Sequence, residues 1–229
     1  MRGPIYLIGY MGAGKSTTGR LLADKLGWHF VDLDDAFLEI HGMTTGDYIR
    51  RYGLEEFRHK EKYVVEDLAE LPIENVVYAT GGGYPCWEDN MECLKELGVS
   101  FYLRWSPEHL TRRIELSGTA QRPVLGDRSG EELLAFVRQQ MGERENYYAQ
   151  ADYVVDAPLD GRLHADNDED LAELLYTMIR NKHCLSIRSI TRLSRSSVRS
   201  RTGWTDIVCS SRWAMSWPPS RRRHIRNRT

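Results

Sequence analysis

Several protein classes are excluded by what this sequence lacks. No apolar run approaches the ~18 residues that a membrane-spanning helix needs, and the run Ile5–Ile8 is too short for the centre of a signal peptide. The four cysteines include no Cys-x-x-Cys pair and the seven histidines lie far apart, so we expect neither a disulfide framework nor a structural zinc site. These absences favour a soluble, cytoplasmic protein.

Acidic and basic residues are unevenly distributed along the chain, and the last 48 residues almost lack acidic ones. Residues 1–181 hold 19 Lys and Arg against 32 Asp and Glu, a net charge of −13, whereas residues 182–229 hold 12 against one, a net charge of +11. A length of 229 residues predicts one domain plus a remainder at about 150 residues per domain. We expect an acidic folded domain over residues 1–181.

The basic extension over residues 182–229 contains 11 arginines and 10 serines without a sustained helical or strand period. We interpret it as a disordered extension, or as sequence never selected as protein, such as out-of-frame translation. The alternative is an arm that binds nucleic acid through its arginines and scattered tryptophans.

Hydrophobic periodicity predicts an α/β fold for the acidic domain. Short β-rich runs at residues 5–8, 29–31, 75–80, 99–103 and 153–155 alternate with segments long enough for helices. We expect helices at residues 16–26, 46–52, 55–71, 107–116, 130–148 and 168–180. This alternation indicates a five-stranded parallel sheet flanked by helices on both faces.

Residues 9–16 read Gly-Tyr-Met-Gly-Ala-Gly-Lys-Ser and match the phosphate-binding loop, or P-loop, between a strand and a helix. The glycines let backbone N–H groups turn toward phosphates, and the helix N-terminus adds partial positive charge. We expect Lys15 to bridge the β- and γ-phosphates and the Ser16 hydroxyl to bind Mg²⁺. The alternative is an accidental glycine-rich turn. The expected nucleotide-binding residues here are Gly12, Ala13, Gly14, Lys15, Ser16 and Thr17.

Two further patterns follow strands. Alternation along an extended segment would place Asp32 and Asp34 on the same side, where they could hold Mg²⁺ through water and engage an acceptor hydroxyl. The alternative is a solvated helix start, because Asp is a good N-cap. Three glycines, Gly81, Gly82 and Gly83, permit close backbone approach to a ligand, or form only a flexible loop.

Three arginines have both a functional and an ordinary interpretation. Arg58 is three residues before Glu61 on a predicted helix, and residue patterns alone favour a surface charge over an anion clamp. Arg122 is the only charge in residues 117–126, a segment typical of a mobile lid, and could stabilise transferring phosphate or be an ordinary loop residue. Arg144 could likewise be a second anion clamp or a solvated helix residue.

The order of these motifs resembles the shikimate kinase family. A P-loop after the first strand is followed by Asp-x-Asp, Phe-Arg-x-x-Glu, Gly-Gly-Gly, Arg-Pro-x-Leu and Arg-x-x-Tyr, all within residues 4–180. The resemblance implies a nucleoside-monophosphate-kinase-like fold with strand order 2-3-1-4-5, and a monomer. It also implies transfer of the ATP γ-phosphate to the 3-hydroxyl of shikimate, with Mg²⁺ as cofactor. This reaction belongs to the shikimate pathway, which leads through chorismate to aromatic amino acids.

Site roles follow from the resemblance by position. Asp32 and Ser16 would serve the metal, Asp34 would be the base, and Lys15 and Arg122 would complete the catalytic set. Arg58 and Arg144 would bind the shikimate carboxylate, with Asp34 and the backbone of Gly81, Gly82 and Gly83 completing the acceptor site. Arg113 and the loop at residues 156–158 would lie near adenine. One departure is visible, because Leu54 replaces the family's usual Glu.

Two alternatives remain at this level. A gluconate kinase has a related P-loop fold and another polyhydroxy acid as acceptor, but it should lack the combined set of motifs. A nucleotide-dependent binding module, or a nucleic-acid-binding protein using the basic extension, belongs to a different class. Arginines for a carboxylate together with a carboxylate and backbone groups for hydroxyls favour shikimate, a small anion with vicinal hydroxyls.

Overall fold

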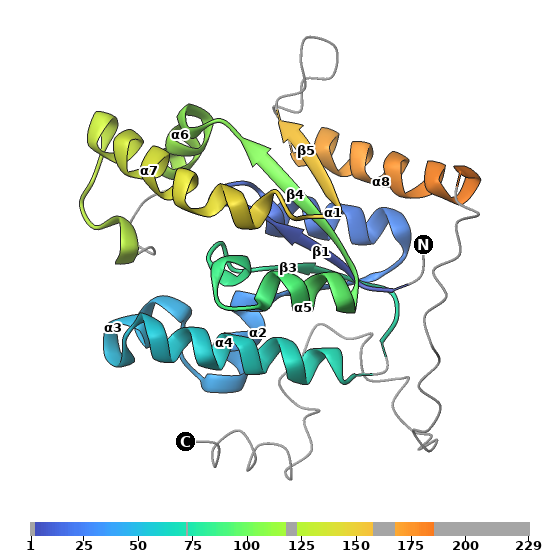
Figure 1. The fold of residues 1–229 in the computed structure, drawn as a ribbon, viewed down its shortest axis with the longest axis horizontal. Helices are drawn as coiled ribbons and strands as arrows, with labels where there is room; N and C mark the ends of the chain where they lie inside the picture. Colours follow the sequence, from blue (N-terminus) through green and yellow to red (C-terminus); the bar gives the residue numbers. More distant parts are fainter. Residues whose placement is uncertain (1–2, 72, 118–122, 158–167, 186–229) are drawn as a thin grey trace. The chain divides into compact units, whose positions relative to one another are not determined.

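Five parallel strands form the sheet of this computed structural model (Figure 1). The strands are β1 (Ile5–Ile8), β2 (His29–Asp32), β3 (Val76–Ala79), β4 (Val99–Trp105) and β5 (Tyr153–Ala157). Their order is β2-β3-β1-β4-β5, which confirms the predicted sheet and its strand order. Ile5 of the central strand lies opposite Val77 on one side and Val99 on the other.

The structure describes residues 3–71, 73–117, 123–157 and 168–185. The described helices are α1 (Lys15–Leu26), α2 (Leu33–His41), α3 (Thr45–Tyr52), α4 (Leu54–Ala69), α5 (Asn90–Leu97), α6 (Pro107–Ser117), α7 (Gly130–Tyr148) and α8 (Asp168–Leu185), with 3₁₀ turns η1 (Tyr84–Cys86) and η2 (Pro123–Leu125). Among these residues, no helix is both long and apolar enough to cross a bilayer.

Helices cover the sheet in packed groups. Helix α1 packs against α8, α6 packs against α7, and α5 packs against β4. Helices α2, α3 and α4 form a separate group that follows β2, seen in light blue and cyan in Figure 1. This connection places the α2–α4 group at the carboxyl edge of the sheet, where the loops after β1 and β3 also emerge.

The core explains why the strands read as continuous apolar runs. Every residue of β1 and β3 is buried, as expected for parallel strands covered on both faces. Leu22 of α1, Leu103 of β4 and Leu175 of α8 are at most 1% exposed and belong to one hydrophobic cluster. Burial of such side chains contributes about 1.5–3 kcal/mol each, so this cluster fixes the helices and the loops between them.

Two helices were missed by the sequence analysis, and one of them corrects the Asp-x-Asp argument. The strand ends at Asp32, and α2 begins at the next residue. Asp32 is the N-cap, and its side chain accepts a hydrogen bond of 3.0 Å from the backbone N–H of Asp34. The extended segment that the alternation argument assumed therefore ends at Asp32, and the alternative of a helix start capped by Asp is confirmed, although the Asp32 charge still acts on the Asp34 carboxyl. The other missed helix, α5, has only eight residues, and a short turn separates it from η1.

The predicted boundary between domain and extension falls inside a helix. Helix α8 continues to Leu185, past the predicted end of the acidic domain at residue 181. Residues 1–185 form one unit, and residues 186–229 lie outside the described part of the chain. The interpretation of the basic extension therefore stays a prediction.

Candidate active site

The P-loop joins β1 to α1 and holds its lysine inward. Gly9, Gly12 and Gly14 have positive φ angles, which side-chain-bearing residues rarely adopt, and Gly14 caps α1. Lys15 is 8% exposed, and its Nζ donates to the carbonyl oxygens of Gly9 at 2.9 Å and Tyr10 at 3.0 Å. Ser16 and Thr17 follow it and are exposed at the N-terminal turn of α1. The arrangement offers an ammonium group, hydroxyls and a helix N-terminus to an anion.

Asp34 lies where the P-loop lysine and the α2–α4 group meet. Its residue is exposed to solvent, yet surrounding protein atoms raise the pKa of its carboxyl to about 6. The nearby Asp32 carboxylate raises the pKa further, while the positive charges of Lys15 and Arg58 oppose the shift. A carboxyl with these neighbours is ionised at neutral pH and can accept a proton, as a general base must.

Arg58 is not the surface charge that residue patterns favoured. Its side chain is only 12% exposed and forms an ion pair with Glu61, whose side chain is 3% exposed, on the same face of α4. Burial raises the pKa of Glu61 to about 7, and the Arg58 charge opposes that shift. Glu61 Oε1 is buried without a hydrogen-bond partner among the described residues. A buried arginine fixed by a neighbouring carboxylate is suited to binding an anion in a defined geometry.

The triple glycine brings backbone close to these charges. A Cβ atom built on Gly81 would overlap Glu61 Oε1 and lie 3.7 Å from Asp34 Oδ1, and one on Gly83 would overlap the Arg58 guanidinium. Any side chain at these two positions would displace the Arg58–Glu61 pair. Gly82 faces the P-loop, because its built Cβ would lie 3.1 Å from the Met11 nitrogen. The glycine backbone after β3 therefore contacts side chains of α4 on one side and the P-loop on the other, with no side chain of its own between them.

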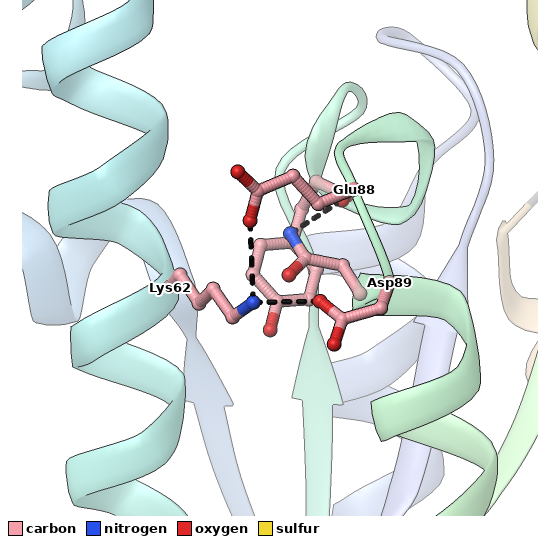
Figure 2. A network of polar contacts seen from close by, with 5 residues as sticks. Lys62, Glu88 and Asp89 are labelled. Carbon is pink, nitrogen blue, oxygen red and sulfur yellow. Dashed lines mark hydrogen bonds and ion pairs between the residues drawn. The ribbon is translucent and has the colours of Figure 1, made fainter.

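A second ion pair fixes α4 to the segment after the glycines. Figure 2 shows Lys62 reaching from α4 to the side chains of Glu88 and Asp89, at 3.3 and 2.6 Å. Glu88 is the one non-glycine residue with positive φ in the described part of the chain, at 45°. Lys62 directly follows Glu61, so this network holds the residue next to the Arg58–Glu61 pair against the segment that follows the glycines and η1.

Helix α7 approaches the same place from the other side. The Tyr148 hydroxyl donates a hydrogen bond to the carbonyl oxygen of Gly82, and Tyr148 is fully buried. Burial raises the pKa of the Cys86 thiol, and the charges of Arg144 and Arg58 partly oppose this shift. Both arginines therefore approach Cys86, one from α7 and one from α4. Two positive charges near the same residue favour the binding of an anion there.

Arg113 lies on α6 at the far side of the P-loop. It pairs with Asp168 through two contacts of 2.8 and 3.0 Å, and its Cζ lies 4.9 Å from the centroid of the Trp105 ring. The Trp105 indole donates to the Ala13 carbonyl oxygen at 3.1 Å. A Cβ built on Gly14 would lie 2.9 Å from Arg113 Nη2, so this arginine borders the phosphate loop.

Other predicted residues are less well placed. Asp156 is the next-to-last residue of β5 and pairs with Arg104, through a contact of 2.8 Å among others. Pro158 lies outside the described residues. Arg122 also lies outside them, so its lid role stays a prediction. Leu54, where the family carries Glu, is the first residue of α4 and is 48% exposed. Glu55 and Glu56 still place negative charge in that first turn, which the helix dipole favours.

Comparison with known proteins decides between the remaining alternatives. A sequence profile of the shikimate kinase family matches residues 11–175. The chain belongs to the shikimate kinase family. It is therefore an enzyme, a kinase, and the predicted resemblance is confirmed. The match includes the P-loop from Met11 onward and every predicted site residue after it.

Related proteins and structures agree with the family. The shikimate kinase of Parabacteroides distasonis is 40% identical over 153 residues, which cover 67% of this chain and 87% of that protein. The structure of shikimate kinase from Bacteroides thetaiotaomicron matches with a TM-score of 0.70 and 36% identity, over 79% of this chain and 99% of that one. Shikimate kinase from Acinetobacter baumannii in complex with shikimate matches with a TM-score of 0.67 and 31% identity, over 79% and 94%.

The comparison with a gluconokinase supports a shared fold only. A gluconokinase from Sinorhizobium meliloti has a TM-score of 0.52 and 18% identity over 80% of this chain and 97% of that one. Identity at this level shows a shared fold and carries no information on the acceptor.

Some site contacts were not visible in the sequence. The predicted Arg-x-x-Tyr motif ends at Tyr147, which is 37% exposed, whereas the next residue, Tyr148, reaches Gly82. The Arg113–Asp168 pair joins residues that are 55 positions apart. The three-residue spacing on a predicted helix indicated the contact between Arg58 and Glu61. No sequence pattern indicated the contacts between residues far apart in the chain.

Proposed function

We propose that this protein transfers the γ-phosphate of ATP to the 3-hydroxyl of shikimate, giving shikimate 3-phosphate and ADP. The observation that carries the proposal is the position of Asp34, whose carboxyl feels the charges of both the P-loop Lys15 and the buried Arg58. A base is thus within electrostatic reach of both a phosphate-binding group and an anion-binding group. Phosphoryl transfer to a hydroxyl of a small anionic acceptor needs these three groups side by side.

Asp34 orients the acceptor hydroxyl and takes its proton. Its pKa of about 6 leaves the carboxyl mostly ionised at neutral pH, and ordinary aspartates, at about 4, are weaker bases. Lys15 binds the β- and γ-phosphates after leaving its two carbonyl partners in the P-loop. Its charge then offsets the negative charge on the transferring group and the leaving ADP.

The acceptor carboxylate binds between Arg58 and Arg144. Glu61 holds the Arg58 guanidinium in one orientation, and the backbone of Gly81, Gly82 and Gly83 lies beside it to contact the acceptor hydroxyls. Arg122 closes on the transferring phosphate from the lid. Arg113, next to Trp105 and the P-loop, contacts the nucleotide.

Mg²⁺ fits the oxygen donors of this site. Mg²⁺ prefers a few protein oxygens completed by substrate phosphates and water, and the exposed Ser16 hydroxyl and the Asp32 carboxylate supply such donors. When bound, the ion neutralises phosphate charge during transfer. Asp32 also accepts the N–H of Asp34, so the residue that serves the ion sets the backbone position of the base.

The catalytic unit is proposed to consist of residues 1–181, completed by the end of α8. The basic residues that follow take no part in this proposal. A monomer suffices, because all the groups named above come from a single chain.

The proposal is tested by a panel of acceptors. Purified protein is incubated with MgATP and, separately, shikimate, gluconate and other small hydroxy acids, and ADP release is followed. We expect ADP release with shikimate. Phosphorus NMR of the product should then show a phosphate on the 3-hydroxyl.

Paired lysine variants provide the control. Lys15→Met should abolish most of the activity, whereas Lys25→Met, at the exposed end of the same helix, should keep it. Wild-type turnover in Lys15→Met would show that the P-loop lysine does not bind the transferring phosphate.

A further inference from the structure

Tyr10 is a P-loop residue whose side chain contacts helix α7. It is 1% exposed, and the Arg144 guanidinium carbon lies 5.3 Å from the centroid of its ring. Its hydroxyl lies 3.4 Å from Gln140 Oε1, one helical turn before Arg144 on α7. The phenol therefore contacts α7 at two successive turns, once through its ring and once through its hydroxyl.

The backbone of the same residue holds the phosphate-binding lysine. The Tyr10 carbonyl oxygen accepts a hydrogen bond of 3.0 Å from Lys15 Nζ and another of 3.2 Å from the Ala13 N–H. Tyr10 thus contacts Lys15 through its main chain and Arg144 through its ring. It is a short physical link between the residue proposed for the nucleotide phosphates and one proposed for the acceptor carboxylate.

The ring is suited to orienting a guanidinium. A guanidinium within about 6 Å of an aromatic face is attracted to it, and more strongly where water is excluded. Burial raises the pKa of the Tyr10 phenol, so the ring stays neutral and presents its π face, and the nearby Arg144 charge only partly opposes that shift. Arg144 itself is partly exposed and also hydrogen-bonds to Tyr148, and the ring further restricts the rotamers that its long side chain can adopt.

We propose that Tyr10 is a positioning residue that holds the Arg144 guanidinium toward the acceptor carboxylate, so that the phosphate loop itself shapes the anion clamp for the acceptor. The proposal rests on the proposed function, because it takes Arg144 to bind that carboxylate. In this role Tyr10 acts through Arg144, whose guanidinium its ring contacts.

The test compares charged and neutral acceptors. Shikimate and its methyl ester differ only in the charge that Arg144 would bind. Tyr10→Leu should raise the KM for shikimate about twofold to thirtyfold, the range expected for a cation–π contact, with a smaller change in kcat. The KM for the methyl ester should stay within about twofold of the wild-type value, since that acceptor offers no carboxylate to orient. Tyr10→Phe keeps the ring and should restore the KM for shikimate.

A double-mutant cycle gives an independent measure. Arg144→Ala alone should raise the KM for shikimate, and adding Tyr10→Leu to it should raise that KM no further. Replacing Tyr10 with phenylalanines carrying one and then three fluorine atoms weakens the π face at nearly constant volume, so the KM should rise along the series. This series keeps the test available if Tyr10→Leu fails to fold.

Three results would overturn the positioning role. The first is an equal rise in the KM for shikimate and for its ester in Tyr10→Leu, which would indicate a general packing defect. The second is a flat KM along the fluorinated series. The third is a full additional effect of Tyr10→Leu in the Arg144→Ala background. Failure of the proposed function is distinguishable, because the wild-type protein would then not turn over shikimate at all.

Discussion

The ionisation of Asp34 predicts how the rate depends on pH. Its carboxyl has a pKa of about 6 instead of 3.8, because surrounding protein atoms reduce its solvation and the Asp32 charge is nearby. At pH 7 about nine-tenths of the molecules carry the ionised base, and at pH 5 about one-tenth do, for a single group of this pKa. Protonation removes the base, so the rate should fall about tenfold for each unit of pH below 6. Above pH 7 the same group should produce no further change.

The assay measures initial rates between pH 4.5 and 8 with both substrates well below saturation. Under these conditions the rate follows ionisations of the ligand-free protein, which is the state described here. Asp34→Asn should lower the rate at pH 7.5 by about 10²- to 10⁴-fold, the usual contribution of a general base, and should remove the acidic fall. The matched control is Asp35→Asn, the neighbour on α2, which should keep the rate at pH 7.5 and an acidic fall, moved slightly to lower pH because the Asp35 charge also raises the pKa of Asp34.

Glu61 is the competing source of such a profile, since burial raises its pKa to about 7. Glu61→Gln removes this ionisation and preserves an oxygen that can accept from Arg58. If Asp34 is the base, Glu61→Gln should retain an acidic fall near pH 6. The reasoning would be refuted if Asp34→Asn kept the wild-type profile, or if its rate at pH 7.5 fell by less than tenfold.

Three further predictions concern binding, the lid and the extension. Arg58→Ala should raise the KM for shikimate by about 10- to 100-fold, as for loss of a charged hydrogen bond, with a smaller effect on kcat; steady-state kinetics with a selective loss of kcat would contradict this. Arg122→Ala should lower kcat by about 10³- to 10⁵-fold, and a change confined to the KM for shikimate would exclude the lid role. A chain ending at Leu185 should keep kcat and its melting temperature in a thermal scan while losing affinity for polyanions, whereas a drop of several degrees would show that the extension stabilises the fold.

The architecture could be predicted because its signals are local. Each strand reads as a short apolar run, and the longer helices show their period in a single segment of chain. The five strands were therefore found to within two residues at each end. Helix α2 was missed because Asp32 both ends a strand and caps a helix, so the change of period occurs within one residue.

The site was predictable only in part, for the same reason. Glycine, lysine and aspartate follow strand ends, and a parallel sheet brings all such ends to one edge. The burial of Arg58 depends on Gly83, 25 positions away, which leaves room for its guanidinium, and no local pattern encodes that contact. Tyr148 and Asp168 likewise act through contacts between distant segments.

The central claim is the identity of the acceptor, and relative specificity tests it most directly. The measurement is kcat/KM for shikimate and for gluconate with the same protein preparation at saturating MgATP and pH 7.5. Paired arginines, a base and a backbone loop fitted to a small cyclic hydroxy acid predict a ratio of at least about 10³ in favour of shikimate, since unsatisfied polar groups in the site would penalise the wrong acceptor. Equal or better turnover of gluconate would contradict the account.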